Sequence, residues 1–110
     1  MILTVLEADL PAGHEAALQA GFAAAGEKGV PAGLVRSELV RDAREPQRWR
    51  IQTWWSSREA LDAMRSAGTP AGLLMFRAAG AEPALSIFHV VATLPSPGTD
   101  AVHAASVPPQ

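Results

Sequence analysis

Residues 47–61 read Gln-Arg-Trp-Arg-Ile-Gln-Thr-Trp-Trp-Ser-Ser-Arg-Glu-Ala-Leu and hold all three tryptophans of the chain. The alternation from 48 to 55 predicts a strand with two different faces. One face carries Trp49, Ile51, Thr53 and Trp55, and the other carries Arg48, Arg50, Gln52 and Trp54. Ser56 precedes Glu59 by three residues, which is the spacing of a capping box. The stretch therefore predicts a strand that runs directly into a helix beginning at Ser56.

Further elements are predicted on both sides of this stretch. Apolar runs at 1–8 and 84–92 predict the first and last strands, and a mixed polar and apolar run at 34–41 predicts another. The polar turn at 42–46 is of hairpin length, so the strands on either side of it pair antiparallel. Helical spacing of apolar residues predicts helices at 13–28, from 56 to about 67, and at 71–79.

The order of these elements predicts one domain of the α+β class. Strand, helix, strand, strand, helix, strand is the ferredoxin-like βαββαβ sandwich with an antiparallel sheet. We expect this domain over residues 1–93 and a proline-rich tail without its own fold over 94–110. The helices can cover only one sheet face, yet the first and last strands are apolar on both faces. An identical subunit would cover the second face, so we predict a homodimer through the sheet faces.

Composition excludes several function classes. A net charge of −2 offers no broad positive field, so we expect no nucleic-acid partner. The first residues resemble neither a signal peptide nor a membrane span, so we expect a cytoplasmic protein without membrane contact. The chain has no cysteine, which removes thiol nucleophiles and thiolate metal sites. Its three histidines, His14, His89 and His103, lack metal-ligand spacing, so we expect no metal site.

Several short motifs in this order resemble the antibiotic biosynthesis monooxygenase-like (ABM) family. They are Pro-Ala-Gly-His-Glu at 11–15, Pro-Ala-Gly at 31–33, Arg-Asp at 41–42, Glu-Pro at 45–46 and Trp-Ser-Ser-Arg-Glu-Ala-Leu at 55–61. The resemblance spans residues 1 to about 93 and implies a dimeric α/β barrel. The family includes cofactor-independent oxygenases that oxidise polycyclic aromatic phenols to quinones, haem-degrading enzymes, and members with no assigned reaction.

The resemblance implies a role for Trp55, which matches the family's tryptophan before the serine and would form a wall of the pocket. The quinone-forming members also use asparagine, tyrosine and arginine, and this chain has neither asparagine nor tyrosine. The haem-degrading members carry a histidine in the second helical region, where this chain has Met64 and Met75. The resemblance therefore does not imply haem degradation, and of the residues used by the quinone-forming members only tryptophan and arginine are available here.

Other residues are candidates on chemical grounds. His89, in the last strand, is the candidate catalytic proton acceptor, because imidazole accepts a proton near neutral pH; a hydrogen-bonded structural histidine is the alternative. Arg50, Gln52 and Trp54 share a face and are candidates for binding an anionic phenolate or carboxylate. Arg50 could instead pair with Glu38 or Glu7 across the strands.

The remaining large side chains are expected to be structural. We predict that Met64, Met75 and Phe76 belong to the core. Trp49 is expected to pack in the hairpin or a dimer interface, and His14 to lie in solvent at a helix terminus.

Two functions follow as hypotheses. The first is a cofactor-independent monooxygenase-like protein that acts on or binds a small planar phenolic or quinol molecule, with no cofactor. The second is a non-catalytic dimeric small-molecule-binding or stress-related module of the same fold. A cleft that holds Trp55 or His89 together with Arg50 would favour the enzyme, and a filled core would favour the module.

Overall fold

A computed structural model describes residues 1–95 of the chain. Its elements are β1 (Ile2–Asp9), α1 (Glu15–Glu27), β2 (Leu34–Arg41), β3 (Arg48–Trp55), α2 (Arg58–Ser66), α3 (Ala71–Ala78) and β4 (Ala84–His89). The predicted tail at 94–110 lies outside the described residues except for its first two positions.

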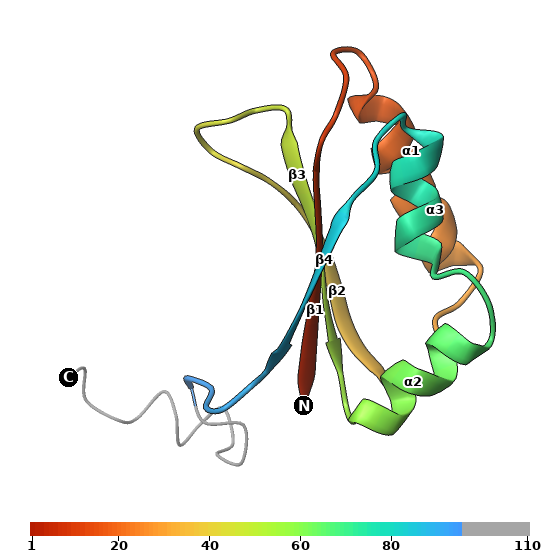
Figure 1. Cartoon of the computed structure of the whole chain (residues 1–110), viewed down its shortest axis with the longest axis vertical. Coiled ribbons are helices and arrows are strands. Elements are labelled where there is room, and N and C mark those ends of the chain that lie inside the picture. Colours follow the sequence, from red (N-terminus) through yellow and green to blue (C-terminus); the bar gives the residue numbers. More distant parts are fainter. Residues whose placement is uncertain (96–110) are drawn as a thin grey trace.

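The four strands form one sheet in the order β2-β3-β1-β4, and every neighbouring pair is antiparallel. All three helices lie on one side of this sheet (Figure 1). Helices α1 and α3 lie beside each other toward one end of the strands, and α2 lies toward the other end (Figure 1). This arrangement confirms the predicted α+β, ferredoxin-like fold. None of the helices in residues 1–95 is long and apolar enough to cross a membrane.

The last strand is shorter than predicted, ending at His89 instead of at residue 92. The reason lies in its partner strand. Ile2, the first residue of β1, pairs with His89, and the N–H of Val90 then donates to the carbonyl of Met1 at 3.0 Å. Residues after Val90 have no remaining β1 backbone opposite them, so the ladder stops there.

The predicted capping residue of α2 was wrong by one position. The side chain of Ser57, which has extended backbone angles, accepts a hydrogen bond from the N–H of Ala60 at 3.1 Å. Ser56 is still tied to the sheet end, because its N–H donates to the carbonyl of Gly33 at 2.8 Å. The chain therefore leaves the sheet at Ser56 and begins the helix one residue later.

The core consists of two separate clusters on the helix side of the sheet. The larger contains Leu10, Leu18, Trp49, Ile51, Phe76 and Ala79, and the smaller contains Ile2, Trp55 and Leu61. Trp49 is 6% exposed and belongs to the larger cluster, with the guanidinium of Arg41 5.5 Å from its ring. The prediction that Trp49 packs in a hairpin or dimer interface therefore missed its burial, which follows from its place on the helix-facing side of β3.

Candidate small-molecule site

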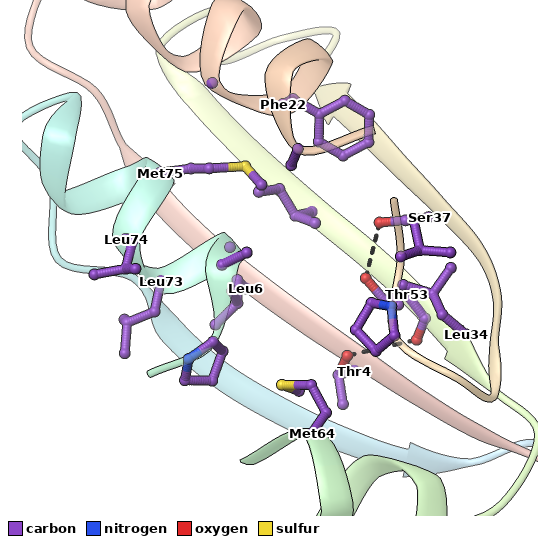
Figure 2. Close-up of a pocket in the computed structure, with 18 of the residues that line it drawn as sticks. Thr4, Leu6, Phe22, Leu34, Ser37, Thr53, Met64, Leu73, Leu74 and Met75 are labelled. Carbon is purple, nitrogen blue, oxygen red and sulfur yellow. Dashed lines mark hydrogen bonds between the residues drawn. The ribbon is translucent and has the colours of Figure 1, made fainter. Parts of the chain in front are cut away.

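A large cavity separates the helices from the sheet, and it is lined by residues of both core clusters. Its volume is about 1080 Å³. All four strands and all three helices contribute to its walls (Figure 2). Ile51 reaches it from the larger cluster, and Trp55 and Leu61 reach it from the smaller one. A volume of this size is slightly above the range of roughly 300–1,000 Å³ for small-molecule sites.

Small residues on the helices keep this space open. Gly21, Ala24, Ala25 and Gly26 of α1 and Ala71 and Gly72 of α3 all line the cavity. A Cβ atom added at Gly72 would lie 2.8 Å from Cδ1 of Leu6, so the α3 backbone approaches the sheet as closely as a residue without a side chain permits. The helices thus cover the sheet without filling the space between the layers.

The walls are mainly aliphatic and thioether side chains. Phe22 of α1, Met64 of α2 and Met75 of α3 reach in from the helices, facing Leu6 and Leu34 of the sheet (Figure 2). Met64 and Met75 pack against the core clusters as predicted, but they also line the cavity. Phe76, in contrast, is fully buried in the larger cluster, as predicted. Methionine walls adapt easily to the shape of an apolar ligand.

A row of hydroxyl groups crosses the floor of the cavity. Thr53 of β3 stands opposite Thr4 of β1 and opposite Ser37 of β2 in the strand register. The Ser37 and Thr53 hydroxyl oxygens are 2.9 Å apart, and either can be the donor. The hydroxyl of Thr4 accepts a bond from Nε1 of Trp55 at 3.1 Å and donates to the carbonyl of Thr53 at 3.5 Å. Figure 2 shows Thr4, Thr53 and Ser37 in succession along the sheet.

Sequence reasoning missed these three hydroxyl residues. The available signal was their position: Thr53 alternates with the apolar residues of the buried face of β3, and Thr4 lies within the apolar first strand. A hydroxyl on a buried sheet face needs a hydrogen-bond partner, which makes such a position informative. The signal did not show that the two residues and Ser37 would fall in one register row.

The only ionisable side chains among the described lining residues are those of Lys28 and Arg65. Both are exposed, so their charges lie where the cavity meets solvent. The described part of the lining holds no carboxylate, imidazole, thiol or phenol that could act as a general base. Residues 1–95 also contain no group of three or more histidine, cysteine, aspartate or glutamate residues placed to hold a metal ion.

The structure separates the candidate site residues between the two sheet faces. Trp55 is 4% exposed and lines the cavity, whereas Trp54, Arg50 and Gln52 lie on the face away from the helices. Arg50 pairs with Glu7, one of the two carboxylates that the sequence suggested for it. Trp54 stacks under the guanidinium of Arg36, which is 4.9 Å from the ring centroid.

Two histidines lie away from the cavity lining. His89 stands at the end of β4 opposite Ile2; it is exposed and does not line the cavity. His14 was expected to be a solvated helix terminus. It is exposed, but its Nδ1 lies 2.9 Å from the carbonyl oxygen of Ala79, so it links the start of α1 to the end of α3.

The face away from the helices carries ion pairs near its end. Arg48 donates to Asp9 at 3.0 Å, and this hydrogen bond raises the pKa of Arg48 above its ordinary value. Exposed pairs of this kind contribute little to stability. The other end of this face carries the apolar residues Leu3, Trp54 and Phe88.

Several solved structures share this fold. A putative antibiotic biosynthesis monooxygenase from Deinococcus radiodurans superposes with a TM-score of 0.67 at 14% identity, covering 86% of this chain and 96% of that one. SnoaB, a cofactor-independent oxygenase from Streptomyces nogalater, superposes with a TM-score of 0.66 at 19% identity, covering 86% of this chain and 97% of that one. The haem degrader MhuD from Mycobacterium tuberculosis, with two haems in its active site, superposes with a TM-score of 0.64 at 24% identity. The match covers 86% of this chain and 99% of that one.

Similarity at this level of identity establishes the fold alone. No curated protein matches the chain significantly. The sequence profile of the antibiotic biosynthesis monooxygenase family, however, matches residues 1–69, which is more than half of the chain. The predicted resemblance is thereby confirmed, and the chain belongs to the antibiotic biosynthesis monooxygenase family.

Proposed function

We propose that the chain binds a small planar organic molecule in the cavity between sheet and helices, and that it oxidises this molecule as a cofactor-independent monooxygenase. The observation that carries the proposal is the cavity itself, which has apolar walls, a volume of about 1080 Å³ and a hydroxyl row on its floor. A flat aromatic would pack against Trp55 and Phe22, while its oxygen atoms would face the hydroxyls.

A cofactor-independent oxygenase needs an electron-rich substrate, because the substrate itself supplies the electrons to dioxygen. A phenolic ring system with an activated ring methylene loses a proton and then transfers electrons to dioxygen. The carbon gains one oxygen atom as a carbonyl, and the second oxygen atom leaves with the two hydrogens as water. Among residues 1–95 the lining supplies no general base, so water would accept the first proton, and Lys28 and Arg65 would favour the resulting anion.

A second function is favoured by that same lack of a base in the described lining. A cavity of apolar walls and hydroxyls suffices to bind a ligand without transforming it. The protein would then be a non-catalytic binding module of the same fold. The two functions share the site and differ only in turnover.

Anthrone and dioxygen provide the test. The oxygenase converts anthrone to anthraquinone with one dioxygen consumed per quinone formed, at a rate above that in buffer, and the rate follows protein concentration. Binding of anthrone by calorimetry without extra quinone would select the binding module. No binding of anthrone by the intact protein would remove both functions.

We also propose that the protein is a homodimer that packs the two open sheet faces together. Within residues 1–95 no helix covers that face (Figure 1). One end of this face is apolar: Leu3 pairs with Trp54 on one side and with Phe88 on the other, and Phe88 is 50% exposed. An exposed apolar patch next to polar and charged residues is common in protein interfaces. Trp54, Arg50 and Gln52 would then act in assembly.

A further inference from the structure

We propose that Thr4, Thr53 and Ser37 form an oxygen-recognising row, which selects planar ligands that carry oxygen atoms along the edge facing these hydroxyls. A plain hydrocarbon of the same shape would be selected against. This inference rests on the proposed function, because it names the class of ligand that the same cavity takes.

The strand register makes the row straight. Thr53 is directly opposite both Thr4 and Ser37, so all three side chains point to the same face of three adjacent strands. Neighbouring strands are about 4.8 Å apart, so the row extends across roughly 9–10 Å of the cavity floor. A ligand edge of two or three fused rings can lie along that length, with more than one oxygen within reach of a hydroxyl.

The row has more hydroxyl hydrogens than its internal hydrogen bonds use. Ser37 and Thr53 together carry two hydroxyl hydrogens, and the single contact of 2.9 Å between them uses one. The other hydrogen is free for a ligand. Thr4 receives the N–H of Trp55, and its own hydrogen reaches the Thr53 carbonyl at 3.5 Å, the outer limit of a hydrogen bond. That hydrogen can turn to a closer acceptor on a ligand.

Because their surroundings are apolar, these hydroxyl donors make binding depend on whether the ligand carries oxygen. Thr53 is 8% exposed, and its neighbours on the floor are Leu6, Ile51 and Trp55. A bound hydrocarbon would displace water and leave the spare hydroxyl hydrogen of Ser37 or Thr53 without an acceptor, which is unfavourable. A ligand with oxygen on the facing edge restores the bonds. Sites that hydrogen-bond a substrate oxygen discriminate strongly against analogues that lack it.

Calorimetry with naphthalene and 1-naphthol tests the row, because the two probes share one ring system and differ by one oxygen. We expect 1-naphthol to bind at least about tenfold more tightly than naphthalene to the intact protein. Ser37→Ala and Thr53→Val should each weaken the binding of 1-naphthol by about five- to tenfold. The affinity for naphthalene should change by less than about twofold. Ser86→Ala is the matched control, since Ser86 is an exposed hydroxyl on the other face of the same sheet.

The outcomes separate the two proposals. If both probes bind equally well and neither variant changes their ratio, the row does not recognise oxygen, but the cavity still binds planar molecules and the proposed function stands. If neither probe binds at the limit of solubility, the proposed function fails together with the row. Thermal unfolding of each variant, compared with Ser86→Ala, shows whether a loss of binding reflects a loss of folded protein.

Discussion

The indole Nε1 of Trp55 donates a hydrogen bond of 3.1 Å to the hydroxyl of Thr4, and this bond joins β3 to β1 on the cavity floor. The two residues are diagonal neighbours, because Trp55 pairs directly with Ile2. Trp55 is 4% exposed, so few water molecules could replace the threonine as a partner. The bond therefore fixes the orientation of the one tryptophan that lines the cavity.

Replacing Thr4 by valine should destabilise the protein by about 1–2 kcal/mol, because it leaves a buried indole N–H without an acceptor. The free energy of unfolding in urea measures the effect. Trp55→Phe removes the donor, and the double variant should lose less than the sum of the two single changes. Additive losses would mean that the bond contributes nothing to stability.

Gly33 occupies a position that no other residue fits, because its φ is +85° and an added Cβ would lie 2.4 Å from the Cβ of Ala60. Gly33→Ala should cost roughly 2–4 kcal/mol, from backbone strain and from displacement of α2. Gly29→Ala is the matched control, with a φ of +94° and no atom within 4 Å of its added Cβ. It should cost only about 1 kcal/mol. Equal urea midpoints for the two variants would contradict close packing of α2 against the chain at Gly33, just before β2.

The hairpin between β2 and β3 depends on the charge of Asp42. Its carboxylate accepts hydrogen bonds from the N–H groups of Glu45 at 2.8 Å and Arg44 at 2.7 Å, and these bonds lower its pKa below the ordinary value of 3.8. A pKa that folding lowers contributes stability above the unfolded value, and this stability is lost as pH falls through the folded value.

Asp42→Asn should therefore be less stable than the natural protein at neutral pH, by a small amount because the turn is exposed. The difference should shrink as pH falls below about 4. Urea midpoints measured from neutral to acid pH check this expectation. A difference that stays constant over that range would assign the effect to the shape of the side chain instead of to its charge.

The fold could be predicted because its signals are local and agree with one another. Alternation in 48–55, the polar turn at 42–46 and the break at 68–70 each fix an element, and their order leaves one common architecture. The start of α2 was missed by one residue because Ser56 and Ser57 are equally good caps in sequence. Only the bond from Ser56 to Gly33, a contact distant in the chain, distinguishes them.

The candidate site was harder to predict because it depends on register and on side-chain size. Alternation separated Trp55 from Trp54 correctly, but it could not place Ser37 opposite Thr53, since pairing across a hairpin is set by the turn and by the irregularity between Leu34 and Arg36. It also could not show that small residues on α1 and α3 leave a cavity, so Met64 and Met75 were assigned to the core alone.

Phe88 tests the proposed dimer, because it lies half exposed on the sheet face that no described helix covers. We expect sedimentation at micromolar concentration to give a dimer mass for the natural protein. Phe88→Glu would place a carboxylate without a partner in the apolar part of the interface, weakening association by roughly 100-fold or more. Leu85→Glu is the matched control: Leu85 is 47% exposed on the same strand, but it faces the cavity. It should stay dimeric while losing apolar ligands, because only one of the two faces of β4 takes part in assembly. A monomer mass for the natural protein, or equal weakening by both substitutions, would rule out association through the open sheet face.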